Sequence, residues 1–191
     1  MTSVVTFGQD SLPRALKAQV LAILEVAWAS GRSIEERLDR PLHDPRSAPV
    51  CMLLVDGDVV LAYLAMPSKV IEHAGVTYRV AGLSSVATHP EHLRNGHGGT
   101  LVTAAREWIE ASGADLGIFT CDAPLVPFYV ACGWTHMPMT VVVGGTRAQP
   151  FRADELGKQT LMGFFSDLAQ GHRADFADAD VYLELREGDL W

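Results

Sequence analysis

The sequence predicts a single α/β (α+β) domain whose strands form one mixed sheet. A chain of 191 residues with 48% hydrophobic residues can fill one core but is short for two domains of ordinary size. The first half of the chain places tight turns between apolar runs, and the second half alternates such runs with helical patterns. Neither an internal repeat nor a low-complexity segment interrupts this order.

A strand and an amphipathic helix are expected first. Residues 4–7 form a short apolar run, and Ser11 is a candidate N-cap. Gly31 stands just past the expected end of the helix, and residues 33–39 could add a further helical turn or two. The apolar stripe of the helix consists of Leu12, Leu16, Val20, Ile23, Leu24, Ala27 and Trp28.

Two turns between antiparallel strands are expected next. Asp56-Gly57 separates apolar runs at residues 50–55 and 59–66, and this dipeptide is a strong hairpin signal. A second turn at residues 73–75 leads into residues 76–88, which form one long extended stretch. We therefore expect an antiparallel meander.

Helices and strands alternate in the second half. A helical pattern follows the glycine-rich loop and ends at Gly113. Residues 116–121 are almost wholly apolar, as in a strand buried on both faces. Residues 126–132 predict a short helix that ends at Gly133, and the next strand begins at Trp134.

The last part of the chain has weaker patterns. Residues 144–171 show no clear period, and the final strand is expected at residues 181–185. A helix is nevertheless suggested between them by Leu161, Met162, Phe164, Phe165 and Leu168.

The charge of the chain favours a cationic small molecule as partner and argues against nucleic acid, because the net charge is -8. Solubility alone would also explain an acidic chain, but the acids gather near the C-terminus. An acidic segment beside a site would attract amines. Against the single Arg186, residues 175–191 contain Asp175, Asp178, Asp180, Glu184, Glu187 and Asp189.

Targeting signals are missing from the sequence pattern. No apolar run approaches the roughly 20 residues that a membrane-spanning helix needs. The first residues also lack the basic and then apolar layout of a secretion signal. We expect a cytoplasmic protein without a membrane partner, and we leave open whether it forms a homodimer.

Cysteines and histidines give no metal-site spacing, so we predict no metal. Cys51, Cys121 and Cys132 are an odd number and would remain thiols in a reducing compartment. Cys51 and Cys121 lie in apolar runs, which indicates packing residues rather than nucleophiles. The seven histidines are scattered and form no His-x-x-x-His pair.

The most informative segment runs from residue 86 to residue 101, where a strand, a tight loop and the start of a helix follow one another. Gly96, Gly98 and Gly99 let the backbone turn and approach a ligand without a Cβ in the way. Amides at a helix N-terminus, with the macrodipole behind them, suit a pyrophosphate. The spacing fits neither a P-loop nor a dinucleotide fingerprint. An ordinary helix-start turn is the alternative.

Two further features accompany this loop. Pro90-Glu91 immediately precedes it, and residues 128–134 read Phe-Tyr-Val-Ala-Cys-Gly-Trp. Together they resemble the GNAT superfamily of N-acetyltransferases, whose signature runs from a strand through Pro-Glu-x-Arg-x-x-Gly-x-Gly into a helix. A Phe-Tyr-x-x-x-Gly-Phe-like segment follows later in that family. The resemblance covers the whole order of elements, and Leu93 departs from it where the family usually has Gln or Arg.

The resemblance implies a mostly antiparallel central sheet of about seven strands, flanked by helices, with a V-shaped opening between the fourth and fifth. It implies acetyl-CoA as co-substrate, with the pantetheine arm paired to the backbone of Val86, Ala87 and Thr88. One amide there would polarise the thioester carbonyl. Tyr129 would protonate the departing thiolate, unless it only packs on a helix face. The pyrophosphate would be held by amides of Arg94, Asn95, Gly96, His97, Gly98 and Gly99.

The last five residues resemble the Gly-Asp-x-Trp terminus of aminoglycoside 2'-N-acetyltransferases. By that resemblance Asp189 and the terminal carboxylate of Trp191 would bind the substrate's amino groups, although a solvated tail is the alternative. Those enzymes place a glutamate in the strand before the loop, where this chain has Ser84. Ser84 or Ser85 would instead orient a water.

We therefore predict direct transfer of an acetyl group to an amine of an aminoglycoside antibiotic, which would confer resistance. The 2'-amino group is the expected position, and kasugamycin is one candidate acceptor. The alternatives are another small amine, a peptide N-terminus, or a non-catalytic sensor that binds acyl-CoA.

Overall fold

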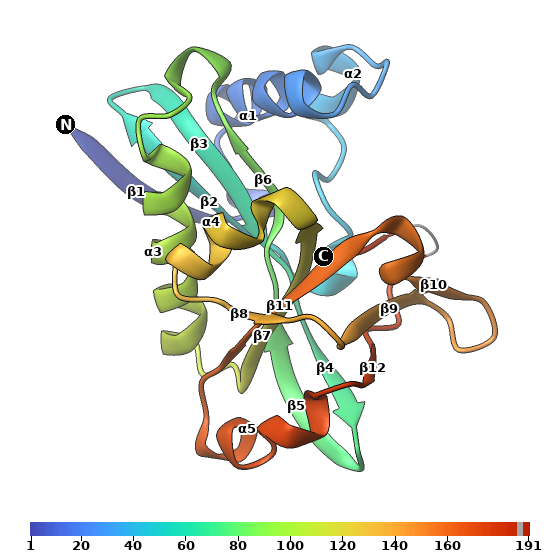
Figure 1. Cartoon of the computed structure of the whole chain (residues 1–191). Coiled ribbons are helices and arrows are strands. Elements are labelled where there is room, and N and C mark those ends of the chain that lie inside the picture. Colours follow the sequence, from blue (N-terminus) through green and yellow to red (C-terminus); the bar gives the residue numbers. More distant parts are fainter. Residues whose placement is uncertain (187–188) are drawn as a thin grey trace. The chain divides into compact units, whose positions relative to one another are not determined.

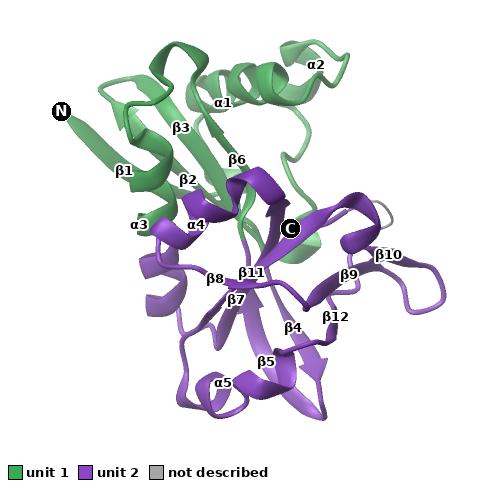
Figure 2. Ribbon diagram, viewed as in Figure 1, with its two compact units in different colours: residues 1–67, 83–105 green, residues 68–82, 106–191 purple. Residues whose placement is uncertain are grey.

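The chain folds into two compact units, which Figure 2 shows in separate colours. Unit 1 comprises residues 1–67 and 83–105, and unit 2 comprises residues 68–82 and 106–191. The structure is a computed structural model that describes residues 1–186 and 189–191. Figure 1 labels the elements of both units.

Unit 1 is built on an antiparallel sheet with the strand order β1-β2-β3-β6. Its strands are β1 (Thr2–Gly8), β2 (Val50–Asp56), β3 (Val59–Met66) and β6 (Ser84–Thr88). The predicted hairpin at Asp56-Gly57 is confirmed, and Gly57 has the positive φ of 59° that such a turn requires. β6 stands at one end of this sheet, beside β3.

Helix α1 (Arg14–Ala27) packs against β3 and β6 and buries Val20, Ile23 and Leu24 in the core of unit 1. The prediction of Ser11 as its N-cap is wrong. Pro13 holds that position, and the Ser11 hydroxyl instead donates to the Gly8 carbonyl at 2.9 Å, within a short 3-10 turn. Helix α2 (Ile34–Leu38) begins with a complete capping box, in which the Ser33 and Glu36 side chains exchange hydrogen bonds with each other's backbone N–H.

Unit 2 contains a five-stranded sheet with the order β4-β5-β7-β11-β8. Its strands are β4 (Ser68–His73), β5 (Val76–Ala81), β7 (Leu116–Asp122), β11 (Lys158–Phe164) and β8 (Thr135–Met137). β5 and β7 are parallel, and the other neighbours are antiparallel. The expected single stretch at residues 76–88 is wrong, because it breaks at Gly82 into β5 and β6, which belong to different sheets.

A second sheet of unit 2 has the order β10-β9-β12, with β12 parallel to β9. Its strands are β9 (Val141–Gly145), β10 (Pro150–Arg152) and β12 (Asp180–Tyr182). The helix suggested within residues 144–171 is wrong over most of its length. Leu161 and Met162 lie in β11, where pairing to β7 on one side and β8 on the other overrides the local pattern. The α-helix of this interval is the short α5 (Asp167–Gly171).

Helix α3 (His97–Ala111) begins in unit 1 and ends in unit 2, and Gly113 follows it with φ 79°. Helix α4 (Val126–Ala131) packs against β8 and β11. The mixed α/β, mostly antiparallel fold is confirmed. The strands in the described part of the chain number twelve in three sheets, where the sequence led us to expect about seven in one. The V-shaped opening stays a prediction.

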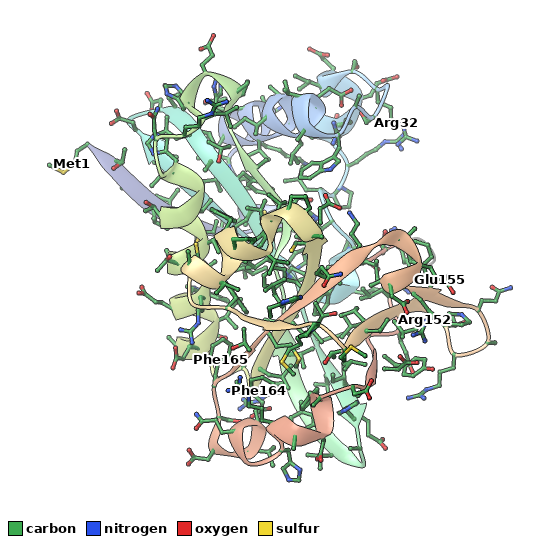
Figure 3. The ribbon with its side chains drawn as sticks, in the orientation of Figure 1. Met1, Arg32, Arg152, Glu155, Phe164 and Phe165 are labelled. Atoms are coloured by element: carbon green, nitrogen blue, oxygen red, sulfur yellow. The ribbon has the colours of Figure 1, made fainter. Side chains whose placement is uncertain are left out.

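The interior of unit 2 is rich in aromatic contacts. Phe164 and Phe165, labelled in Figure 3, follow each other at the end of β11. The Arg106 guanidinium lies 5.2 Å from the centre of the Phe165 ring, and the Arg173 guanidinium lies 5.0 Å from that of Phe164. All three cysteines of the chain are free and buried, as predicted for Cys51 and Cys121.

Candidate functional site

Strand β6 carries a bulge. Tyr63 pairs with Ala87 and Ala65 pairs with Ser84, so Ser85 and Val86 together face the single residue between Tyr63 and Ala65. Ser85 has φ 54°, a left-handed conformation that is uncommon for a residue with a Cβ. A bulge breaks the hydrogen-bond ladder and re-aims the local backbone groups. The bulge therefore includes Val86, one of the three residues whose backbone the sequence led us to expect beside the thioester.

The position of β6 in its sheet leaves one side of its backbone without a partner strand in that sheet. β6 pairs with β3 on one side and is the last strand in the order β1-β2-β3-β6. A strand at the end of a sheet presents N–H and C=O groups along its outer side, which a further extended chain can pair with. Val86 lies within the bulge, and Ala87 and Thr88 follow it on the same strand.

The loop after β6 turns through two left-handed residues before α3 begins. Arg94 has φ 63° and Gly96 has φ 79°. The first helical bond of α3 joins the Thr100 N–H to the Gly96 carbonyl at 2.9 Å, and the Thr100 hydroxyl donates to the same oxygen at 3.2 Å. An α-helix leaves the amides of its first turn without intrahelical partners, and such a turn suits a phosphate.

Gly96 leaves open space beside its backbone. A Cβ built on this residue would have no other heavy atom of the chain within 4 Å. A ligand can therefore approach the main chain here closely, as a pyrophosphate bound by amides must. The residues fit the nucleotide end of coenzyme A in this respect.

The sequence interpretation missed an imidazole cluster along this loop. The His89 and His92 rings are 5.1 Å apart between centres, and the His92 and His97 rings are 6.2 Å apart. His89 Nδ1 accepts a hydrogen bond from the Glu91 N–H at 3.3 Å, which caps a 3-10 turn at Pro90–His92. The sequence did contain a signal for this cluster, because three histidines stand within nine residues. Their N–H groups, with the exposed Arg94, add donors beside the amides.

Unit 2 holds Tyr129 on α4, where it is buried with 6% of its surface exposed. Its ring packs edge-on against Phe119 and against Phe128, each with centres 4.9 Å apart. Burial raises the pKa of Tyr129 well above its usual value of 10, and the nearby Cys121 and Cys132 raise it further. The phenol is therefore neutral at physiological pH and can act as a proton donor.

The rest of the segment around Tyr129 has a packing role. Gly133 has φ 88°, and an added Cβ would approach the Arg106 side chain to 3.3 Å. The Trp134 indole lies over Gly117 of β7, where a Cβ would come within 2.5 Å of its ring. The backbone N–H of Trp134 donates to the Tyr129 carbonyl at 3.2 Å. Gly133 and Trp134 thus fix the end of α4.

The C-terminal residues Asp189, Leu190 and Trp191 dock on unit 2. Trp191 is 7% exposed, and its main-chain oxygen accepts hydrogen bonds from the Thr120 N–H and hydroxyl, each at 2.7 Å. The Asp189 side chain is exposed. Glu187 and Gly188, which belong to the predicted terminal motif, lie outside the described residues.

The predicted site residues divide between the units. Ser84, Ser85, the β6 backbone and the loop up to Gly99 belong to unit 1, whereas Tyr129, Asp189 and Trp191 belong to unit 2. Ser84 pairs with Ala65, and the water-orienting role of Ser84 or Ser85 stays a prediction.

Among residues 1–186 and 189–191, no group of three or more His, Cys, Asp or Glu side chains is arranged to hold a metal ion. None of the helices in the same residues has both the length and the apolar character to cross a bilayer.

A buried polar trio in unit 1 was not predicted from the sequence. The Tyr63 hydroxyl lies 2.8 Å from His43 Nε2 and 3.3 Å from Cys51 Sγ. Burial lowers the pKa of His43 to about 4 and raises the pKa of Cys51. Both groups are therefore neutral at physiological pH.

The model of the acetyltransferase (GNAT) domain matches residues 12–137, a segment that passes through both units. A search of curated protein sequences gave no significant match.

Solved structures resemble the chain at low sequence identity. An acyl-CoA N-acyltransferase from Pseudomonas aeruginosa has a TM-score of 0.58 and 13% identity, over 85% of this chain and 99% of its own. Glucosamine-6-phosphate N-acetyltransferase from Arabidopsis thaliana has a TM-score of 0.57 and 14% identity, over 71% and 92%. Ribosomal-protein-S18-alanine N-acetyltransferase from Escherichia coli has a TM-score of 0.55 and 16% identity, over 87% and 95%. Of one longer matched chain, from Enterococcus faecalis, this chain spans 33%.

Proposed function

Because the chain belongs to the GNAT acetyltransferase family, we propose that residues 1–191 work as one domain that transfers an acetyl group from acetyl-CoA to an amine. The observation that supports this proposal best is the succession of a bulged end strand, a left-handed loop and a helix N-terminus in unit 1. Each is a place where backbone groups can meet an extended, anionic ligand.

The cofactor roles follow from these elements. The outer backbone of Val86, Ala87 and Thr88 would pair with the pantetheine arm, and the amides from Arg94 to Gly99 would hold the pyrophosphate. An N–H at the β6 bulge would donate to the thioester oxygen. Removing one donor of that kind typically costs about 10²–10³-fold in turnover, so a single amide is enough to matter.

Acetyl-CoA supplies the acyl group as a thioester when it is bound. The acceptor nitrogen would form a bond to the carbonyl carbon while the carbon–sulfur bond breaks. Tyr129 would give its phenolic proton to the sulfur, and a water held by Ser84 or Ser85 would take the proton of the amine. Since a thiol has a pKa of about 8.5, the thiolate leaves tolerably without help. Placing amine and thioester together contributes more, about 7–11 kcal/mol.

For the acceptor, we propose the 2'-amino group of an aminoglycoside, with kasugamycin as one candidate and antibiotic resistance as the consequence. The exposed carboxylate of Asp189 on a docked segment and the net charge of -8 support a cationic acceptor. One structural neighbour is named for an amino sugar, glucosamine 6-phosphate. Another is named for the alanine of a ribosomal protein, which favours a peptide N-terminus as the second candidate.

A thiol-release assay tests the proposal. Acetyl-CoA would be offered with a panel of aminoglycosides including kasugamycin, simple polyamines and peptides with a free N-terminus. An acetyltransferase releases coenzyme A with the right amine. Tight acetyl-CoA binding without thiol release for any amine would instead identify a sensor.

A further inference from the structure

Within residues 1–186 and 189–191, one edge of β7 pairs with another strand only near its start. β5 pairs in parallel with this edge at Leu116 and Gly117, whereas β11 pairs with the opposite edge along the whole of β7. Farther along, at Thr120, the partner is Trp191, whose main-chain oxygen accepts the Thr120 N–H at 2.7 Å. Trp191 thus satisfies a backbone donor that β5 leaves unpaired.

The Thr120 side chain strengthens the same contact. Its hydroxyl donates to the Trp191 oxygen, also at 2.7 Å. The Trp191 indole is buried and lies over Gly82, where an added Cβ would come within 2.7 Å of the ring. Residue 191 is therefore held by its main chain and by its side chain.

Gly144 of β9 packs against Asp189 and Leu190, the two residues before Trp191. A Cβ on Gly144 would lie 2.5 Å from the Asp189 carbonyl oxygen and 3.2 Å from Leu190 Cδ2. The third nearest atom is the Asp189 carbonyl carbon at 3.7 Å, so the three nearest atoms all belong to residues 189–190. Gly144 does not have a positive φ, unlike Gly145 at 70°. Packing of the C-terminal residues, and not backbone conformation, explains the glycine at position 144.

The contacts of residues 189–191 with Gly144 and Thr120 fix the backbone of Asp189 but leave its side chain exposed. The Asp189 N–H donates to the Arg186 carbonyl at 3.0 Å. This bond joins two main-chain groups, so it leaves the Asp189 carboxylate available to a cation. An anion on a fixed backbone loses little conformational freedom when it binds a cation, which favours affinity.

We infer that Thr120 and Gly144 are positioning residues, which dock residues 189–191 and so hold the Asp189 carboxylate in place for the acceptor amine. The inference rests on the acetyltransferase function proposed above. Neither residue touches the acceptor. Both act through the docked segment, and their effect falls on acceptor affinity rather than on cofactor affinity.

Gly144→Ala in the full chain is the main test. Its Cβ has no room while residues 189–190 are docked, so the segment must leave. We expect the Thr120 amide to exchange with solvent at least tenfold faster by NMR, because its acceptor is lost. We expect the acceptor KM to rise about ten- to a hundredfold and acetyl-CoA affinity to stay unchanged, because one charge-assisted contact is lost.

Two further variants separate positioning from general damage. In a chain shortened by residues 189–191, Gly144→Ala should change neither the circular dichroism spectrum nor the kinetics any further, since the atoms it would meet are gone. Thr120→Val, which removes the hydroxyl at nearly constant shape, should raise the acceptor KM about five- to tenfold. Thr120→Ser, which keeps the hydroxyl, should restore it.

The outcomes distinguish this inference from the proposed function. Fast Thr120 exchange with an unchanged acceptor KM in Gly144→Ala would overturn the inference and leave the acetyltransferase intact. Unchanged exchange would show that Gly144 does not seat the segment. If the unaltered chain acetylates no amine of the panel, the proposed function fails, and the acceptor role of the segment fails with it.

Discussion

Replacing Gly96 by alanine tests the cofactor loop at its most constrained residue. A φ of 79° is a left-handed conformation that costs a residue with a Cβ about 1–2 kcal/mol. The new Cβ would meet no heavy atom of the chain within 4 Å, so steric overlap adds nothing. The loop must either keep its shape at that cost or relax and displace the amides around it.

The expected loss of cofactor affinity follows from those amides. A hydrogen bond from a backbone N–H to a charged phosphate contributes about 1.5–3 kcal/mol, which corresponds to about ten- to a hundredfold in affinity. We expect Gly96→Ala to raise the Kd of acetyl-CoA by that factor, measured by isothermal titration calorimetry. Gly96→Val should raise it further, because its branched side chain enters the space that the phosphates need.

Gly75 offers a matched control. It has φ 78° in the β4–β5 turn, and an added Cβ would likewise meet nothing within 4 Å. Gly75→Ala should therefore lose the same stability in thermal unfolding as Gly96→Ala but bind acetyl-CoA like the unaltered chain. Equal acetyl-CoA affinity in the two variants would exclude the loop from the cofactor site.

Three other predictions concern single side chains. Tyr129→Phe should lower kcat by about 10²-fold and keep acetyl-CoA affinity, and an unchanged kcat with rate-limiting chemistry would assign Tyr129 to packing alone. Asp189→Asn should raise the acceptor KM about ten- to a hundredfold, and unaltered kinetics with the best acceptor would remove Asp189 from the site. Because burial lowers the pKa of His43 to about 4, unfolding takes up a proton between pH 6.5 and pH 4. The unaltered chain should lose about 2–3 kcal/mol more stability than His43→Gln across that range in urea unfolding, and equal losses would refute the burial argument.

Local signals predicted much of the fold. Asp56-Gly57 specifies its hairpin through the φ that only the glycine adopts easily, and Gly113 marks the end of α3 in the same way. The left-handed loop could be placed because Gly96 stands between a strand and a helical pattern. Each of these features depends on a few neighbouring residues.

The features that the sequence did not predict depend on pairing between strands that lie far apart in the chain. Apolar residues stand on both sides of Gly82, and a single glycine within such a run does not by itself end a strand. Leu161 and Met162 have no helical or strand preference strong enough to predict β11, whose partners β7 and β8 lie elsewhere in the chain. Ser85 gives no hint of a left-handed φ, because serine rarely adopts one.

The candidate site likewise combines residues in local motifs with contacts between residues that are distant in the sequence. The loop, Tyr129 and Asp189 were found because they stand in recognisable segments. The docking contacts of residues 189–191 could not be predicted, because Gly82, Thr120 and Gly144 come from separate segments of the chain and have no common spacing. Contacts between residues 71 positions apart, as between Thr120 and Trp191, leave no periodic trace in a sequence.

The glycines of this chain show why conformation alone does not identify a binding site. Gly75 and Gly96 have nearly the same φ and the same open space, yet Gly75 only turns a hairpin between β4 and β5. What distinguishes Gly96 is its place between an end strand with a bulge and the first amides of a 15-residue helix, which can together hold an extended anion. Gly144 differs from both, because its φ is not left-handed and its missing Cβ makes room for other residues of the chain. A glycine therefore indicates a ligand site only where the backbone around it can donate to that ligand, and in this chain the bulged end strand and the helix start favour the loop after β6.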